Sequence, residues 1–508
     1  MGASVKRVLV LGLAAASLGV CAVGATDQTT ANVSVDSEYY SYIDKLSGMG
    51  YIQSLPNGAR PYSRMQMARW VVEAEERAVE KPMPGYLADE LQALENYLAP
   101  EIETIKGNPT QDSFRLRSVK AELDYQKADK FDYHYGNVAG SWAPFSRNHN
   151  GHKYGRDGNV SATVEASGNV GHETAVSIKG RGAYDRDNDG DFDLEEAYIK
   201  TRAGSLSFEA GRQALIWGQG ESGHLLLGNN MKPLTAIQMH LANPVKVGGF
   251  FSFLGEVDFH SFYGWLDRDR ADDARSRGVH DYNNPGLLGL RVDITPANWF
   301  TFGASRISML GGNHNGLDHT DWKHWTTGRN DDGDHDKWDD IGGFDFRFRF
   351  PSFQLYGETM GEDAAGGLPS DWAYRGGVYI PKLTHDGSWD MTLEMAHTNE
   401  DWYIHQTYKD GWTYSGDIMG DAMGNDARTY YARINHYLPG EKKIGLYYLR
   451  TEFQRNQANH PTVDEIGLTG QMNLGANRFL TGTLGYANID GRYDDNPYFA
   501  GVSLEWRM

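Results

Sequence analysis

Apolar and polar side chains alternate, residue by residue, through much of the chain beyond residue 113. The clearest runs are FDFRFRF over residues 344–350 and VSLEWRM over residues 502–508, in which every second residue is apolar. Successive side chains of a β-strand point to opposite faces of a sheet, so this period of two predicts strands with one apolar and one polar face. The alternation alone fits both a soluble β-sandwich and a membrane barrel.

The connections between the predicted strands separate these alternatives. Short turns, such as FPS at 350–352 and LPGEKK at 438–443, alternate with long polar loops, such as residues 267–285. Outer-membrane barrels have this asymmetry, with short periplasmic turns and longer extracellular loops. We therefore predict an all-β transmembrane barrel of antiparallel strands over residues 113–508, with its long loops outside the cell.

The alternation predicts about eighteen strands, an even number that leaves both ends of the barrel in the periplasm. They begin near Phe114, Val160, Thr174, Glu196, Leu206, Val245, Glu256, Leu287, Trp299, Gly342, Phe353, Trp372, Trp389, Arg428, Ile444, Glu465, Phe479 and Tyr498. The stretch 218–245 fits more than one strand assignment. Trp299, Trp389 and Trp506 fall near the short turns, where an aromatic girdle is expected at the membrane interface.

Residues 26–112 have a helical rather than a strand period. Helices are predicted at residues 37–47, 63–79 and 86–98. Ser63, followed three residues later by Gln66, forms a capping box at the start of the second helix. We expect a small helical domain in the periplasm, which either merely precedes the barrel or acts as a plug or a contact for periplasmic machinery.

The first 25 residues have the features of a secretory signal peptide. Lys6 and Arg7 precede an apolar run, and Val23-Gly24-Ala25 provide the small residues of a cleavage site. The apolar run is too short to anchor the chain in a bilayer. A lipoprotein signal ending at Cys21 is the alternative.

The charge of the chain argues against a nucleic-acid partner. Lys and Arg number 48 and Asp and Glu number 68, which gives 48 − 68 = −20. Removal of residues 1–25 would take away two basic residues and the single cysteine, so disulfide bonds are not expected to hold the mature chain together. A strongly negative surface repels phosphate backbones and attracts cations.

Three segments resemble a known family. The segment GRQALIWGQGESGHLLLGNNMKPLTAIQM (211–239) looks like the hallmark of the capsule assembly Wzi family, in which a GRQ strand and a W-G turn lead into an LLL-x-NN-x-(K/R)-P loop. The Tyr-rich and Gly-rich residues 402–434 resemble that family's loop before a late strand. IDKLSGMG (43–50), followed by RPYSRMQMA (60–68), is similar to its N-terminal helical pattern.

The resemblance implies an eighteen-stranded outer-membrane barrel with a periplasmic helical bundle, whose surface face holds capsular polysaccharide on the cell. It also implies that the protein is not an enzyme, and the sequence offers no nucleophile–base–acid constellation. Met508 departs from the aromatic residue at which such barrels usually end, so Trp506 would stand in for recognition by the barrel assembly machinery.

We therefore predict an outer-membrane protein that binds and anchors capsular polysaccharide at the cell surface. Its partners would be this polysaccharide, the outer-membrane lipid and the barrel assembly machinery. The alternative function is a porin or polysaccharide export channel, which would conduct steadily where a plugged anchor would stay closed.

Sugars expose flat CH faces that pack on aromatic rings, and hydroxyl groups that bond to polar side chains. The aromatic candidates in the predicted outer loops are Trp322, Trp325, Trp402, Tyr408, Trp412 and Tyr414, with Trp142 and Trp338 beside them. The family resemblance adds Asn229, Asn230 and Lys232. The other interpretation of the rings is loop packing or a girdle, and the 229–232 loop could equally fold inward and constrict the pore.

Residues 185–196 match the twelve-residue calcium loop. The predicted metal ligands are Asp185, Asp187, Asp189, Asp191, Asp193 and Glu196. Gly190 stands at the sixth position, where the sharp turn needs it, and an apolar residue stands at the eighth. We predict a structural Ca²⁺ here, with no other cofactor, although strands rather than helices flank the loop. The alternative is an acidic, solvated hairpin.

Overall fold

The computed structural model describes residues 28–508, except for residues 131, 136–138, 277, 328–336 and 366–367. The predicted signal peptide lies outside the described residues. Within the described part of the chain, no helix combines the length and the apolar character needed to cross a membrane.

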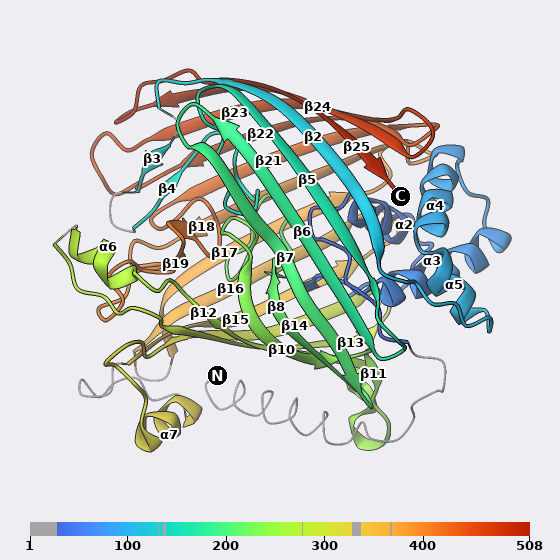
Figure 1. Cartoon of the computed structure of the whole chain (residues 1–508), viewed down its shortest axis with the longest axis horizontal. Helices are drawn as coiled ribbons and strands as arrows, with labels where there is room; N and C mark the ends of the chain where they lie inside the picture. The colour runs from blue at the N-terminus through green and yellow to red at the C-terminus, as the bar shows by residue number, and fades with distance from the viewer. Residues whose placement is uncertain (1–27, 131, 136–138, 277, 328–336, 366–367) are drawn as a thin grey trace.

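Eighteen antiparallel strands close into a barrel, as predicted (Figure 1). In order around the wall they are β2 (Arg115–Lys127), β5 (Asp157–Asn169), β6 (Thr174–Asp185), β7 (Asp189–Ala203), β8 (Leu206–Gln213), β10 (Leu234–Leu241), β12 (Glu256–Trp265), β13 (Gly286–Ala297), β14 (Phe300–Leu310), β15 (Trp338–Arg349), β16 (Gln354–Ala365), β17 (Leu368–Ile380), β18 (Trp389–Thr398), β21 (Arg428–Leu438), β22 (Lys442–Glu452), β23 (Thr462–Asn473), β24 (Arg478–Asp490) and β25 (Tyr498–Arg507). Strand β2 pairs with β25 on one side and with β5 on the other, which closes the ring.

The fourth strand, β7, begins at Asp189, seven residues before the predicted Glu196. The sixth strand is the position where the prediction assigns the wrong segment. It is β10, which starts at Leu234, and not a strand that starts at Val245. Val245 belongs to the two-residue β11 (Val245–Lys246), which pairs with the start of β12. Pro244 lies between β10 and β11 and has no N–H to donate to the ladder, so the strand is interrupted there.

The alternation places apolar side chains on the outside of the wall and polar ones inside. In β15, Asp345 and Arg347 are buried in the lumen, 0% and 8% exposed. On the outer face of other strands, large apolar side chains such as Leu446 and Leu484 are exposed at 44% and 57%. An outer band of this kind is typical of a wall that faces lipid. Trp299, Trp389 and Trp506 are also exposed, at 54%, 37% and 55%.

From residue 28 onward, four helices precede the barrel: α2 (Tyr39–Gly48), α3 (Arg64–Glu80), α4 (Gly85–Tyr97) and α5 (Ala99–Ile105). They form their own apolar core, which includes Ile43, Met67 and Leu94. The backbone N–H of Gln66 donates to the Ser63 hydroxyl at 3.1 Å, so Ser63 caps α3 as the sequence predicted. The described residues of the N-terminal segment are therefore a helical domain with a core of its own.

This helical domain lies at the end of the barrel where the short turns gather (Figure 1). The amide of Gln53 accepts from Asn298 in the β13–β14 turn at 2.7 Å. Asp89 accepts from the backbone N–H of Gly440 in the β21–β22 turn at 2.6 Å. The short strand β1 (Ala59–Arg60) then reaches into the lumen and pairs with β9 (Ile216–Trp217). The N-terminal segment thus contacts both the short turns at the rim of the barrel and strand β9 inside the lumen.

The long loops gather at the opposite end (Figure 1). They carry the helices α6 (Arg270–Ser276) and α7 (His319–Thr327) and two small hairpins, β3 (Tyr133–His134) with β4 (Ser141–Trp142) and β19 (Thr413–Tyr414) with β20 (Asp417–Ile418). The η1 helix (Gly249–Leu254) lies in the β11–β12 turn at the short-turn end.

Candidate functional site

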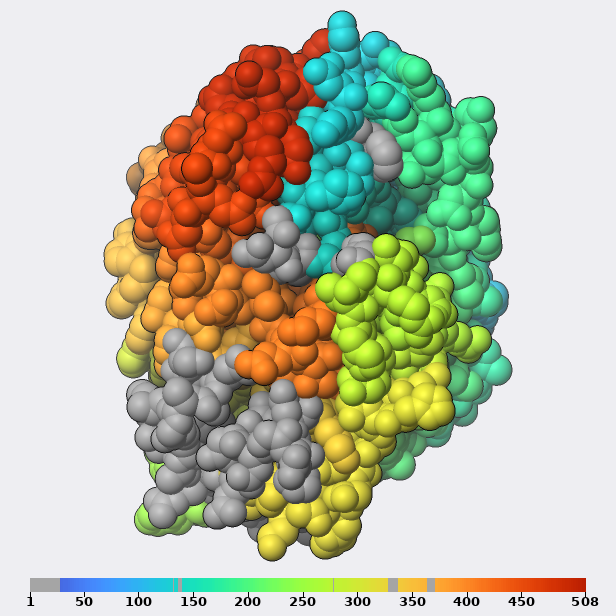
Figure 2. Space-filling view, turned by 90° about the vertical axis from the view of Figure 1, so that its left-hand side faces the viewer, coloured from blue at the N-terminus to red at the C-terminus, as the bar shows by residue number. Residues whose placement is uncertain are grey.

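Three long loops fold inward at the long-loop end and pack against one another inside the barrel. They are the described parts of residues 128–156, residues 218–233 and residues 399–427. Leu225, Leu226 and Leu227 are each 0% exposed and belong to one apolar cluster with rings from the other two loops. Figure 2 shows this end of the molecule, with the orange 399–427 loop between the cyan and yellow-green segments. We call these three segments the loop plug.

Two carboxylates of the wall hold the 218–233 loop by its backbone. Glu358 of β16 accepts hydrogen bonds from the N–H groups of Gln219 at 2.6 Å, Gly220 at 2.8 Å and Leu225 at 3.1 Å. Glu394 of β18 accepts from the next two N–H groups, those of residues 221 and 222, at 2.5 and 2.9 Å. Bonds from neutral donors to a carboxylate are stronger than neutral pairs, so this loop is rigidly placed.

Arg375 of β17 joins this loop to the 399–427 loop. Its Nη1 lies 2.9 Å from Glu394 and donates to the Ser222 hydroxyl at 2.6 Å. Its Nη2 forms an ion pair with Asp421 of the other loop. Only 3% of Arg375 is exposed. One guanidinium group therefore links the wall to two parts of the loop plug.

Glycines permit the close approach of these loops. A Cβ atom on Gly220 would collide with the carbonyl oxygen of Gly223, and one on Gly420 would collide with the Tyr403 hydroxyl. That hydroxyl donates to the Leu225 carbonyl at 2.6 Å, which links the 399–427 and 218–233 loops. The glycines of the WGQGESG and IMGDAMG segments are thus explained by contacts inside the loop plug.

The structure buries most of the aromatic side chains that the sequence suggested for sugar binding. Trp402, Tyr408 and Trp412 are 0% exposed and Tyr414 is 9% exposed, and Trp142 and Trp338 are buried as well. The Trp412 indole donates to the Leu226 carbonyl at 3.1 Å, and the Tyr408 hydroxyl donates to the Gly311 carbonyl at 2.9 Å. The prediction that Trp402, Tyr408, Trp412 and Tyr414 offer faces to sugar at the surface is wrong, because these four rings belong to the core of the loop plug.

Asn229, Asn230 and Lys232 cross-link loops. Asn229 donates to the carbonyl of Asn148 at 2.9 Å, and Asn230 donates to the carbonyl of residue 418 at 3.1 Å. Lys232 forms an ion pair with Asp193 of β7 at 3.0 Å. Of the two interpretations left open by the sequence, inward folding of this loop agrees with these contacts.

Trp322 and Trp325 remain at the surface of the long-loop end, on α7. The Trp325 ring is fixed, because the Arg306 guanidinium lies 4.5 Å from its centroid and its indole donates to Ser308 at 2.8 Å. Trp322 meets Trp325 edge to face, with centroids 5.7 Å apart, and is 41% exposed. A supported ring with a free face is the geometry that packs on a sugar.

The six acidic residues predicted to bind calcium do not converge. Asp185 and Asp189 face each other across the tip of the β6–β7 hairpin, and Asp187 pairs with Arg156 at 2.6 Å. Glu196 lies far along β7, opposite Lys179, about 20 Å from the tip at the usual rise of a strand.

The prediction that residues 185–196 form one calcium loop is therefore wrong in its geometry. The strands run to the tip of the hairpin, so the acidic side chains are spread along β7 instead of curling around one point. Among all residues that the structure describes, there is no group of three or more His, Cys, Asp or Glu side chains that could hold a metal ion.

Two neighbouring polar cavities of 200 and 310 Å³ lie between the helical domain and the loop plug. Asp36, Ser37, Glu38 and Asn148 line both cavities. Burial, and secondarily a neighbouring histidine, lower the pKa of His149 in the first cavity to about 4, so this ring is neutral at physiological pH. The lumen therefore keeps polar cavities between the helical domain and the loop plug.

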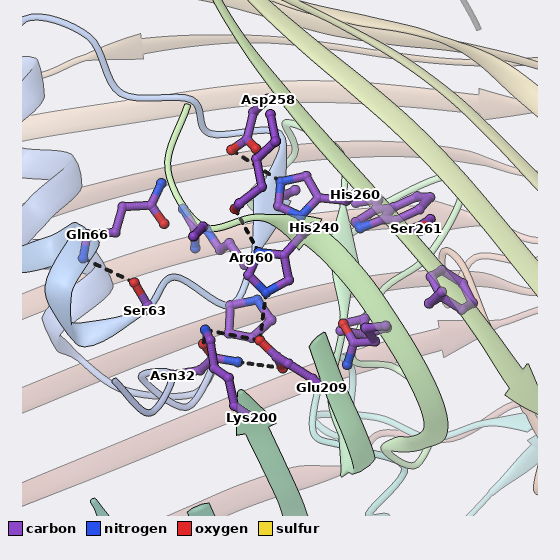
Figure 3. Close-up of a pocket in the computed structure, with 18 of the residues that line it drawn as sticks. Asn32, Arg60, Ser63, Gln66, Lys200, Glu209, His240, Asp258, His260 and Ser261 are labelled. Atoms are coloured by element: carbon purple, nitrogen blue, oxygen red, sulfur yellow. Dashed lines mark hydrogen bonds and ion pairs between the residues drawn. The ribbon is translucent and has the colours of Figure 1, made fainter. Parts of the chain in front are cut away.

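A smaller pocket lies where the helical domain meets the wall (Figure 3). Glu209 accepts from His240 at 2.8 Å and pairs with Lys200 at 3.0 Å, and His260 faces Asp258 at 3.4 Å. Its cavity of 30 Å³ is far below the roughly 300 Å³ at which ligand pockets begin. Asn32 of the N-terminal segment donates to Glu209 at 3.0 Å and accepts from Lys200 at 2.6 Å, so these polar groups join that segment to the wall.

Comparison with known proteins bears on this architecture directly. The family model described as "Capsule assembly protein Wzi" matches residues 126–496, which is most of the chain. The chain belongs to the capsule assembly Wzi family. The resemblance found in the sequence is thereby confirmed.

Two relatives of this family member are informative. The chain is 26% identical over 260 residues to an uncharacterized 55.8 kDa protein in the cps region of Klebsiella pneumoniae. That match covers 48% of this chain and 49% of the relative, so it spans about half of the relative's length.

The second relative is a solved structure, Wzi of Escherichia coli. That protein is described as an outer membrane protein involved in group 1 capsule assembly and as a carbohydrate-binding β-barrel. The two folds agree with a TM-score of 0.69 at 18% identity, over 94% of this chain and 100% of that one. This likeness establishes the fold of the Wzi-family chain.

The residues that organise this Wzi-family lumen were not singled out from the sequence. Glu358 and Arg375 hold the loop plug, and Arg347 adds a bond from its Nη2 to the Gln219 carbonyl at 2.9 Å. Each occupies an inward position of an alternating strand, where charge is expected in any wet lumen. The sequence feature that could have distinguished these three residues from other inward-facing charges is the glycine-rich 218–233 loop, which packs against them.

Proposed function

We propose that this protein resides in the outer membrane and holds capsular polysaccharide at the cell surface, with its long loops outside and its helical domain in the periplasm. Membership of the capsule assembly Wzi family supports this function. The E. coli relative, a barrel of the same fold, is described as carbohydrate-binding, which supports polysaccharide as the ligand. The role is one of binding and retention.

The observation that carries the proposal is the filled lumen. The loop plug occupies the long-loop end, and the helical domain occupies the short-turn end. Buried ion pairs lock both to the wall, at Arg375 with Asp421 and at Lys45 with Asp390. A porin or export channel needs a continuous aqueous path, whereas an anchor works with a closed barrel.

We propose the exposed face of Trp322 as one contact for the polymer. The ring lies at the long-loop end, and Trp325 behind it is fixed to the rim. Lys323 beside it on α7 is exposed and can donate to sugar hydroxyls or carboxylates. Trp322 is the ring among the predicted aromatic candidates that keeps an exposed face in the described structure.

Binding of purified capsular polysaccharide from the source strain tests this contact. Trp322→Ala should weaken the affinity roughly fivefold, since one aromatic contact contributes about 1 kcal/mol. Trp322→Phe should keep most of the affinity. Trp389→Ala removes a similarly exposed ring at the opposite end and is the matched control. Equal affinity of the Trp322→Ala and wild-type proteins would remove this ring from the binding surface.

A deletion strain tests the function itself. Loss of an anchor should release polymer into the medium, while loss of an export channel should retain polymer inside the cell. Re-expression of the wild-type chain should return the polymer to the surface. Unchanged surface polymer in the deletion strain would overturn the proposal, and intracellular polymer would favour the channel.

A further inference from the structure

The turn between β11 and β12 has an unusual composition for the short-turn end of the barrel. Residues 247–255 read VGGFFSFLG, a segment of nine residues without a charged side chain. Its centre is the η1 helix, which places three phenylalanines within four residues. Glycines flank the helix on both sides, and Gly249 and Gly255 adopt positive φ angles of 67° and 68°.

This turn folds back over the outer face of the wall. In β12, Tyr263 and Trp265 point outward and are exposed at 37% and 43%. Val257 and Phe259 lie on the same face, because they are separated from Tyr263 by even numbers of residues. Each of these two is nevertheless only 3% exposed. Another segment of the chain must therefore cover the outer face of the wall at Val257 and Phe259.

The cover is provided by the turn. Val257 and Phe259 form an outward-facing cluster with Leu241 and Val292 of the neighbouring strands. The side chains of Val247, just before η1, and of Leu254, the last residue of η1, pack against this cluster. Comparable outward positions near other short turns are open, as at Ile444 of β22, which is 48% exposed. The η1 helix is therefore attached to the lipid-facing side of the barrel.

The opposite side of η1 is exposed and apolar. Phe250 is 86% exposed and Phe253 is 63% exposed. The Phe251 ring stands between them, with centroids 5.2 Å from Phe250 and 6.3 Å from Phe253. Two such rings in water would leave a large apolar surface unburied, which soluble surfaces rarely do.

The level of the turn along the barrel axis identifies what surrounds it. Gly255 forms a bridge with Thr295, near the end of β13 and just before the short β13–β14 turn. That turn carries Trp299, 54% exposed, in the aromatic girdle of the short-turn end. Aromatic side chains at this level sit at the boundary between acyl chains and headgroups. The Phe-rich turn continues this girdle outward from the wall.

We propose that the η1 turn is an interfacial membrane anchor, whose Phe250 and Phe253 rings insert into the lipid leaflet at the short-turn end of the barrel. The uncharged sequence, the attachment to the lipid-facing wall and the continuity with the girdle point to lipid as the occupant. A short apolar helix lying in the interface binds through its buried apolar area. The strands cross the bilayer, and this turn additionally grips one leaflet beside them.

Spin labels at single cysteines test the anchor in the full-length protein, in a Cys21→Ser background. The labelled Phe250→Cys and Phe253→Cys proteins are reconstituted in vesicles of phosphatidylethanolamine and phosphatidylglycerol. The ratio of collision rates with oxygen and with a water-soluble nickel chelate reports the depth of each label. We expect this ratio to be several-fold higher at both positions than at Val79→Cys, an exposed site of α3.

A label at Leu446→Cys on the outer wall separates failure of the anchor from failure of the membrane location. A lipid-like ratio at Leu446 with water-like ratios at both phenylalanine positions would overturn the anchor and leave the barrel in the membrane. Dipolar broadening between labels at Phe250 of neighbouring molecules would mean that a second copy covers the turn, and would also overturn it. Heat-modifiable migration on gels verifies that each variant is folded.

Discussion

Lys45 of helix α2 forms a salt bridge with Asp390 of strand β18, with Nζ and Oδ2 3.2 Å apart and side-chain exposures of 0% and 1%. The same ammonium group donates to the Pro381 carbonyl at 2.7 Å and lies 4.3 Å from the centroid of the Tyr437 ring. The pair therefore holds the helical domain in the mouth of the barrel.

Replacing the lysine should release α2. In Lys45→Met, Asp390 would stay buried without its counter-ion, and breaking a buried pair in this way typically costs about 3–5 kcal/mol. Hydrogen exchange of the α2 amides should accelerate accordingly. Lys106→Met is the control, because that ammonium is 45% exposed and its pair with Glu75 contributes about 1 kcal/mol at most. Equal protection in the Lys45→Met and wild-type proteins would contradict a docking role for the pair.

The ion pairs of Arg375 should keep the pore closed. Arg375→Met leaves Glu394 and Asp421 buried without a cation, so we expect the loop plug to detach more often. Planar-bilayer recordings should show conductance steps that the wild-type protein rarely has. The matched control is Arg450→Met, which removes a 39% exposed guanidinium from the wall. A variant as silent as the wild type would mean that other contacts suffice to hold the loops.

The stability of the helical domain should fall as pH rises, because of Glu90 in α4. Burial raises the pKa of this carboxyl from 4.5 to about 8, against the opposing effects of Lys443 and Lys45. In the window between pH 4.5 and about 8, the folded state holds a proton that the unfolded state has lost. Stability therefore declines with pH across this window and levels off above it.

Glu90→Gln should remove that decline and stabilise the helical domain above pH 8, by roughly 3–5 kcal/mol if the full shift is realised. Thermal unfolding followed by far-ultraviolet circular dichroism across the window measures both effects. Glu80→Gln serves as the control, since its side chain is exposed at the end of α3. Parallel pH curves for the Glu90→Gln and wild-type proteins would argue against a buried, protonated Glu90.

The buried and exposed tryptophans of the long-loop end should behave differently. Trp412→Ala opens a cavity in the loop plug and should destabilise it by about 3–5 kcal/mol. Trp322→Ala, at an exposed site, should change stability by about 0.5 kcal/mol or less while weakening polymer binding. Protease sensitivity of the 399–427 loop distinguishes the two. A stable Trp412→Ala plug would show that the core of these loops is loosely packed.

The barrel could be predicted from the sequence because its signal is local. A period of two, as in residues 344–350, fixes both the strand and the side that faces lipid. The sixth strand was assigned to the wrong segment because Pro244 divides the alternation of apolar and polar residues between β10 and β11, so that each carries only part of it. The lengths of the connections predicted which of them gather at each end of the barrel, since every second connection between antiparallel strands lies at the same end.

The loop plug inside the barrel could not be predicted, because its packing depends on contacts between residues that are far apart in the sequence. The alternation shows that Glu358 faces inward, but its partners at Gln219 and Gly220 lie 139 and 138 positions away. Trp402 and Trp412 are of a residue type that is common in sugar-binding sites, but their positions in the fold make them part of a buried core. The acidic spacing of residues 185–196 fits a calcium loop, yet strand pairing across the hairpin overrides that local preference.

The pairing of β2 with β25 sets the order in which this molecule can be built. Residues 118–127 bond along their whole length to residues 507–498, so the seam stays open until the last strand of the wall is in place. Once β2 and β25 have paired, a continuous ring of hydrogen-bonded strands surrounds the lumen. Neither α2 nor the 218–233 loop can then enter between two strands. After closure, the helical domain and the loop plug can enter or leave the lumen only through the two ends of the barrel, which is where their buried ion pairs with the wall hold them.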